Sequence, residues 1–167
     1  MRPADPGVLS GRPLLDIGTG DGQTLTALVA GTGLVVGLDR SLSALRAARM
    51  TGLKRSVCSA VPDIPFRSGV FEVVLAGDLW HHLADDALRS TLGEVRRVLT
   101  PGGRVVAWWY EAPARPAPDA PAFPRSFAEV ARITQEQGFA SVRALDLEIE
   151  LASGPPTVGL VASNDPG

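Results

Sequence analysis

The chain has 167 residues, of which 45% are hydrophobic and 20% are charged, and its formal net charge is −2. This balance is typical of a globular domain with a core, and it excludes a chain that is disordered throughout. No stretch concentrates lysine and arginine, so nothing in the sequence supports a nucleic-acid partner.

The N-terminal residues 1–11 lack the apolar core of a signal peptide, and no run approaches the roughly 20 apolar residues that span a bilayer. We therefore expect a cytoplasmic protein without a membrane partner. Cys58 is the single cysteine, which excludes an internal disulfide, and we expect it to be a buried, inert thiol in a strand. One cysteine and the distant pair His81–His82 do not predict a metal site.

Short apolar runs that do not alternate with polar residues predict strands covered on both faces, as in a parallel sheet. They cover residues 13–17, 34–38, 71–76 and 105–108. Helical spacing lies between them, most clearly over 85–99, where apolar residues recur on one face and Pro101 follows. A capping box formed by Ser126 and Glu129 predicts another helix that ends at Gly138, and weaker helices fit 22–30 and 41–50.

This alternation predicts a single α/β domain over residues 1–167, with a short tail at 1–11. Near the C-terminus, 142–149 and 157–162 look like two strands joined by the turn residues 153–156, a hairpin-like ending on a mostly parallel sheet. The loop 112–124 holds five prolines and can be neither helix nor central strand. Two interpretations of this loop remain open: a solvated linker, or a mobile flap over a pocket.

A glycine-rich turn follows the first predicted strand, in the segment 14–22. Glycine lets the backbone turn sharply or approach a ligand closely. In the dinucleotide fingerprint the third glycine comes three residues after the second, but here Gln23 fills that position and Gly22 comes two residues after Gly20. The spacing therefore argues against a nicotinamide or flavin dinucleotide and for a ligand without a pyrophosphate.

Asp39 ends the second predicted strand, 17 residues after Gly22. An acidic residue at this place can accept hydrogen bonds from ribose hydroxyls. The alternative is a turn residue before a helix capped by Ser41. Together with the glycine turn, Asp39 predicts a site for a nucleoside.

The chain resembles class I S-adenosylmethionine-dependent methyltransferases that act largely on small molecules. The resemblance is close over residues 14–107 and rests on five segments in order: 14–22, 37–39, 64–66, 71–83 and 94–103. It implies a Rossmann-like α/β fold with a seven-stranded, mostly parallel sheet, an antiparallel last strand and helices on both faces. It also implies S-adenosylmethionine as the cofactor.

The resemblance implies roles for individual residues. Asp16 would orient the methionine end, Asp39 would hold the ribose, and Gly77 and Asp78 would lie near the methionine part and the methyl group. The full set expected at the cofactor is Asp16, Gly18, Thr19, Gly20, Gly22, Asp39, Arg40, Ala60, Val61 and Gly77.

The chain departs from the family pattern at three places. Ala60 stands where an aspartate often contacts the adenine amino group; Asp63 is a weak substitute, and the amide of Val61 can still contact the ring edge. Glu72 replaces the usual aspartate before the fourth strand. Only about a dozen residues precede Leu14, where the family has helices that help cover the acceptor, so cover is expected from 112–124, a partner chain, another copy of this chain or the acceptor itself.

His81 and His82 follow the fourth strand, together with Asp78. These three are the candidates for a general base or an acceptor-orienting group. The alternative for each histidine is a structural role in the loop, which we favour because similar pairs recur with many acceptor types.

Aromatic residues gather after the fourth and fifth strands, where ligands bind in open parallel sheets. We expect Trp80, Trp109 and Tyr110 to bind the acceptor, and at least one of Trp108 and Trp109 to pack under a helix, because neighbours on a strand face opposite ways. The functional hypothesis is methyl transfer to a small, apolar or aromatic acceptor. The alternative is a non-catalytic cofactor-binding protein or subunit that supports a partner enzyme.

Overall fold

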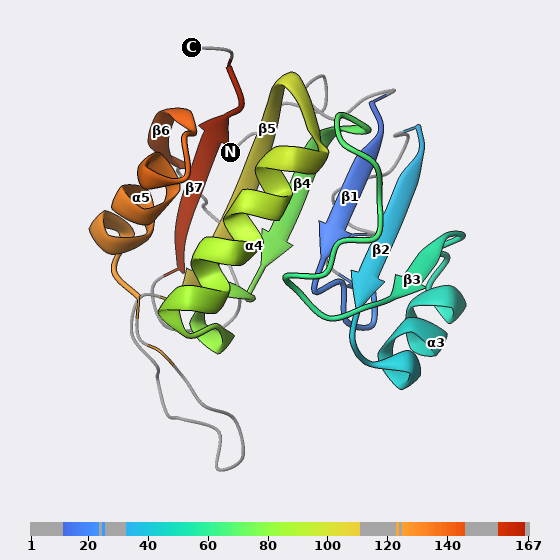
Figure 1. Cartoon of the computed structure of the whole chain (residues 1–167). Coiled ribbons are helices and arrows are strands. Elements are labelled where there is room, and N and C mark those ends of the chain that lie inside the picture. Colours follow the sequence, from blue (N-terminus) through green and yellow to red (C-terminus); the bar gives the residue numbers. More distant parts are fainter. Residues whose placement is uncertain are drawn as a thin grey trace.

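The computed structural model describes residues 12–23, 25, 33–110, 123, 125–145 and 157–165 (Figure 1). Most of the helix expected over 22–30, nearly all of the proline-rich loop 112–124 and the turn at 153–156 lie outside these described residues. Within the described part, no helix is long and apolar enough to cross a membrane.

Strands and helices alternate through most of the described chain, as predicted. In order they are β1 (Leu14–Ile17), β2 (Val35–Asp39), α3 (Leu42–Met50), β3 (Ser56–Cys58), β4 (Phe71–Gly77), a 3₁₀ turn (Trp80–His82), α4 (Asp85–Val98), β5 (Leu99–Tyr110), α5 (Phe127–Glu136), β6 (Ala140–Leu145) and β7 (Thr157–Ser163).

The seven strands form one sheet in the order β3-β2-β1-β4-β5-β7-β6. The first five in this order run parallel, whereas β7 is antiparallel to both β5 and β6. The predicted Rossmann-like sheet with an antiparallel last strand is therefore confirmed. Figure 1 shows the arrowheads of β1, β2 and β4 at the same lower edge, which is where a parallel sheet presents its ligand site.

Local sequence explains where the helices begin. The Ser41 side chain accepts the backbone N–H of Ala44 at the start of α3, and the Ser126 side chain accepts that of Glu129 at the start of α5. Helix α4 has no side-chain cap, but two aspartates in its first turn complement the positive end of the helix dipole. These local interactions set the three helix starts before any tertiary contact is considered.

Alternating side chains of β5 divide the core between the two faces of the sheet. Trp109 packs in the cluster under α4 and α5, which also holds Val105 and Ala107. Trp108 packs in the cluster on the opposite face, with Leu14, Leu75 and other residues. The expectation that at least one of these tryptophans is a core residue is confirmed, since both are at most 5% exposed.

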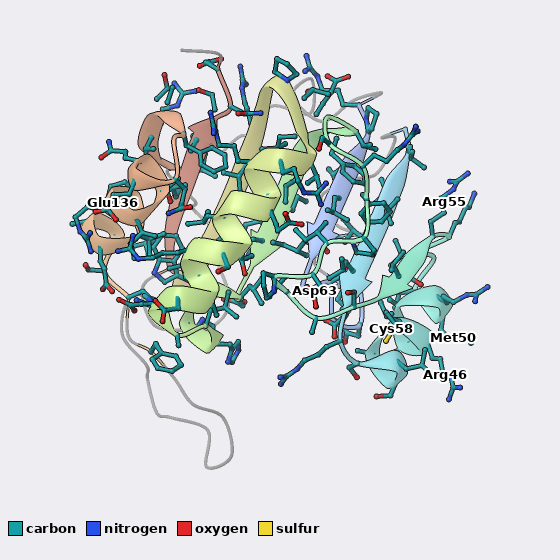
Figure 2. All side chains as sticks on the ribbon, in the orientation of Figure 1. Arg46, Met50, Arg55, Cys58, Asp63 and Glu136 are labelled. Carbon is teal, nitrogen blue, oxygen red and sulfur yellow. The ribbon has the colours of Figure 1, made fainter. Side chains whose placement is uncertain are left out.

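The expectation that Cys58 is buried is wrong. The thiol is exposed because β3 is the edge strand of the sheet and Cys58 is its last residue. Figure 2 shows it beside α3, at the β3 end of the sheet. A three-residue edge strand cannot cover a side chain on both faces.

The packing of Trp108 requires a glycine at position 77, the last residue of β4, and a point substitution tests this requirement. A Cβ at Gly77 would lie 2.3 Å from the Trp108 ring, so Gly77→Ala should destabilise the fold by about 1–3 kcal/mol. Gly93 in α4 is the matched control: a Cβ there would lie 3.6 Å from the Gln137 side chain, and Gly93→Ala should stabilise by about 0.5–1 kcal/mol through helix propensity. Urea unfolding measures both; equal effects would contradict the packing argument.

Candidate active site

A cavity of about 430 Å³ opens at the carboxyl edge of the parallel strands. It is lined by Gly18, Leu38, Asp39, Arg40, Ser59, Ala60, Val61, Gly77, Asp78, Leu79, His82 and Leu83. These residues lie at the carboxyl ends of β1, β2, β3 and β4 or shortly after them, and the topology places these strands side by side. The volume is within the range of pockets for small ligands.

The turn after β1 has the backbone conformation that only glycine adopts easily. Gly18 and Gly20 have φ of 73° and 54°, in the left-handed region. The amides of Gly18 and Thr19 both donate to the carbonyl of Leu38, which holds the turn against the end of β2. A Cβ at Gly20 would meet no protein atom, so the space beside the turn is open for a ligand.

Asp39 connects this turn to the next helix. Its Oδ2 accepts the N–H of Gly20 at 2.9 Å, and its Oδ1 accepts the N–H of Ser41 at 2.8 Å. A carboxylate oxygen can accept more than one hydrogen bond, so both oxygens retain capacity toward the cavity. Asp39 therefore has two roles, as a fixed part of the turn and as an acceptor for hydroxyl groups.

Asp16 lies below the turn and is only 6% exposed. Burial raises the pKa of Asp16 to about 7; the Thr19 hydroxyl opposes this and the charge of Asp39 adds to it. Asp16 lines a second, smaller cavity of about 40 Å³ together with Thr19, Asp78 and Trp108. Two carboxyl groups and an aromatic ring around a small space suit a cationic group.

Asp78 borders both cavities and is held in a strained conformation, with φ of 52°. Its amide donates to the carbonyl of Trp108 at 2.8 Å, which fixes the backbone beside β5. Its buried Oδ1 has no hydrogen-bond partner among the described residues. Burial raises the pKa of Asp78, and the nearby His82 lowers it. An unpaired, buried carboxyl oxygen at a cavity wall is a site for a ligand donor or a proton.

The two histidines differ in position. His82 is exposed and lines the cavity, whereas His81 does not line it. Burial lowers the pKa of His81, and the neighbouring His82 lowers it further. Of the three candidate catalytic residues, the structure therefore brings Asp78 and His82 to the cavity together.

Most residues expected at the cofactor lie at one of the two cavities. Gly18, Asp39, Arg40, Ala60, Val61 and Gly77 line the larger cavity, and Asp16 and Thr19 line the smaller one. Gly20 lies in the same turn, one residue after Thr19, and donates to Asp39. Gly22 lines neither, because it packs against α3, where a Cβ would lie 3.1 Å from that of Ala48. The exposed Asp63, labelled in Figure 2, also lines neither cavity.

Two of the three aromatic residues expected to bind the acceptor, Trp80 and Trp109, do not line the cavity. Trp80 is 1% exposed and Trp109 is 0% exposed, and both belong to the core under α4 and α5. The side chain of Tyr110 is outside the described part. The geometry gives no support for acceptor contacts by Trp80 and Trp109, because core neighbours cover their rings.

Trp108 is the aromatic residue that the sequence analysis missed at this site. Its indole lies over Gly77 and lines the smaller cavity. The signal that could have found it is strand alternation: Asp16 and Trp108 share a face of the sheet with Leu14 and Leu75, opposite to Trp109.

Comparison with known proteins agrees with this geometry. A family model described as a methyltransferase domain matches residues 15–107, more than half of the chain, and the chain belongs to this family. A relative from Synechocystis, called an uncharacterised methyltransferase, is 35% identical over 94 residues, which cover 56% of this chain and 44% of that protein. The chain spans about half the length of the curated relatives it matches, or less.

Solved structures share the fold. A SAM-dependent methyltransferase from Methanosarcina mazei superposes with a TM-score of 0.78 at 17% identity, covering 100% of this chain and 99% of that one. A S-adenosylmethionine-dependent methyltransferase from Mesorhizobium loti superposes with a TM-score of 0.75 at 20% identity, covering 93% and 92%. S-adenosylmethionine is the cofactor that the family and this fold imply.

The residues present fit that cofactor. Asp39 has free acceptor capacity for ribose hydroxyls, and the turn leaves open space beside Gly20. Asp16 and the unpaired oxygen of Asp78 suit the amino group of the methionine part. Among the described residues, no group of three or more histidines, cysteines, aspartates or glutamates could hold a metal ion.

The buried Asp16 should make stability depend on pH. Burial favours the neutral carboxyl group and raises the pKa of Asp16 in the folded state to about 7. The contribution of Asp16 to the free energy of unfolding is therefore fully present at pH values below its ordinary pKa of 3.8, and it is lost as the pH rises through 7. Asp16→Asn should therefore be more stable than the wild type at pH 8, by about 1–3 kcal/mol, and show a smaller difference at pH 5.

Chemical unfolding at the two pH values measures the effect. The exposed Asp63 supplies the control Asp63→Asn, which should leave stability nearly unchanged at both. A loss of stability in Asp16→Asn at pH 8 would contradict the assignment of a buried, costly charge.

Proposed function

We propose that this domain transfers the methyl group of S-adenosylmethionine to a small, apolar or aromatic acceptor. The observation that carries the proposal is the composition of the 430 Å³ cavity, which has Asp39 at one end and Asp78 with His82 at the other. The glycine turn lies beside it. Bound S-adenosylmethionine would supply a methyl group that is already activated by its sulfonium.

The nucleoside half of the proposal rests on the residues after β1, β2 and β3. Asp39 accepts the ribose hydroxyls while its two bonds to Gly20 and Ser41 keep the carboxylate in place. Ala60 and Val61 form the wall where the adenine lies. With Ala60 in place of an acidic side chain, the adenine edge is bound by backbone groups alone.

The acceptor half rests on the residues after β4. Leu79 and Leu83 give this end of the cavity an apolar wall, which favours an apolar or aromatic acceptor. These residues orient the acceptor and exclude water, which supplies much of the rate when the donor is already reactive. Where the acceptor must lose a proton, His82 or Asp78 accepts it.

Two measurements test the proposal directly. Isothermal titration calorimetry with S-adenosylmethionine and S-adenosylhomocysteine establishes binding. A screen of phenols, amines and thiols, with S-adenosylhomocysteine formation as the readout, establishes turnover. Absence of binding contradicts the proposal, and binding without turnover of any acceptor supports the alternative of a non-catalytic binding protein.

Asp39 gives the sharpest test of the nucleoside half. Asp39→Ala should weaken S-adenosylhomocysteine binding by about 1–3 kcal/mol, because charge-assisted hydrogen bonds to the ribose are lost. Asp63→Ala, an exposed site outside both cavities, is the control and should bind as the wild type does. Binding by a folded Asp39→Ala that equals the wild type would exclude Asp39 as the ribose acceptor.

The two adjacent histidines form a matched pair for the acceptor half. With an acceptor that must lose a proton, His82→Gln should lower kcat/KM by about 10²- to 10⁴-fold if it is the base, and His81→Gln should have a much smaller effect. S-adenosylhomocysteine affinity should change little in both variants. Equal rates for His82→Gln and the wild type would leave Asp78 as the proton acceptor.

A further inference from the structure

Arg125 is a buried cation outside the cavity, only 2% exposed. Its Nη1 donates to Asp85 Oδ1 and Glu129 Oε1, both at 2.6 Å, and its Nη2 donates to the carbonyl of Leu83 at 2.6 Å. The guanidinium therefore joins the end of the loop after β4, the first turn of α4 and the first turn of α5. Each of these acceptors belongs to a different part of the fold.

The backbone around Arg125 makes further connections to the same region. The carbonyl of Arg125 accepts the buried indole N–H of Trp109 at 2.9 Å. The amide of Phe123 donates to the carbonyl of His81 at 2.8 Å, and the Phe123 ring lies 5.9 Å from the Arg125 guanidinium carbon. Residues 123 and 125 thus hold the loop after β4 at two carbonyls, those of His81 and Leu83.

This loop forms the acceptor end of the cavity. Asp78, Leu79, His82 and Leu83 all line it. Within the loop, a short 3₁₀ turn has two internal backbone bonds, from His82 to Leu79 and from Leu83 to Trp80. A turn of three residues is a weak unit by itself, so the contacts made from outside decide where its side chains lie.

Only an arginine suits this arrangement. Two of the three guanidinium nitrogens make these contacts: Nη1 is shared by two carboxylates, and Nη2 is directed at a carbonyl. A lysine would keep the charge but supply one nitrogen in place of two. Loss of the cation would leave Asp85 and Glu129 without the shared donor that joins them, and only the more distant charges of Arg89 and Arg132 would still act on Asp85.

We propose that Arg125 is a positioning residue for methyl transfer, which fixes the wall from Asp78 to Leu83 through the carbonyl of Leu83 and the start of α4. The proposal rests on the function proposed above, because it assigns the wall to the acceptor. A purely stabilising ion pair would make a different prediction, since it would change the free energy of unfolding and leave the native loop as it is.

His81 and His82 are the only histidines in the chain, so imidazole NMR resonances report on this loop alone. Arg125→Lys should shift the resonances of both histidines. It should also raise the titration midpoint of His81 by about 0.3 pH unit or more, because burial lowers the pKa of His81 in the wild type and water would reach the ring in the variant. Affinity for S-adenosylhomocysteine should stay within a few-fold. With an acceptor that the enzyme methylates, Arg125→Lys should raise the KM for the acceptor by a larger factor than it lowers kcat.

Arg132→Lys is the matched control. Arg132 lies on α5 and pairs with the exposed Glu136, which Figure 2 shows on the edge of the molecule opposite to α3. The substitution Arg132→Lys should leave the His81 titration unchanged. If Arg125→Lys does not fold, Glu129→Gln weakens the same cluster with Arg125 in place and is judged by the same His81 titration.

The positioning role would be overturned if the histidine resonances and titrations of Arg125→Lys, or of Glu129→Gln where it replaces that variant, were superimposable on those of the wild type. This holds whatever the stability of the variant. A wild-type protein that does not bind S-adenosylhomocysteine would instead overturn the proposed function, and the His81 titration would still decide whether Arg125 sets the loop.

Discussion

The carboxylate of Asp39 accepts the amides of Gly20 and Ser41, and so joins the turn after β1 to the end of β2. Gly18 and Thr19 reinforce this joint through the carbonyl of Leu38. Because β1 and β2 are parallel neighbours, their ends meet at one edge, and a single side chain can hold both. The open space beside the turn, which is the centre of the proposed cofactor site, exists because these bonds fix the backbone around it.

The same edge concentrates groups that cost stability. Asp16 is buried with a raised pKa, Asp78 is strained and has an unpaired oxygen, and neither is needed to complete the core. Strain and unpaired polar groups persist where the surrounding structure is rigid enough to impose them. Here the rigidity comes from two well-packed clusters, one on each face of the sheet. A ligand with a cationic end and hydroxyl groups would satisfy these groups.

The two ends of the cavity are built differently. The end proposed for the nucleoside consists of backbone turns that follow directly from neighbouring parallel strands. The end proposed for the acceptor is a short loop whose carbonyls at His81 and Leu83 are bound by Phe123 and Arg125, more than 40 residues further along the chain. A site with one end built by neighbouring strands and the other end contacted from elsewhere in the fold suits a domain type that serves many acceptors.

Local patterns in the sequence determined the order of strands and helices, the caps at Ser41 and Ser126, and the glycine turn with Asp39. These features depend on interactions between residues close in the chain, or on a family pattern of spacing. The structure contains the predicted elements that fall within its described residues, whereas most of the helix expected over 22–30 lies outside them. The sheet with its antiparallel last strand followed from the resemblance to a known family.

Tertiary structure alone decided which aromatic residues are core and which are at the site. Trp80 and Trp109 were expected beside the acceptor, but helices α4 and α5 cover them, and Trp108 occupies the other face over Gly77. Exposure of Cys58 followed from the edge position of β3, and the burial of Arg125 from contacts with partners 40 and 42 residues away. Sequence spacing gives the side of a strand on which a residue lies, but what covers that side depends on how distant elements pack.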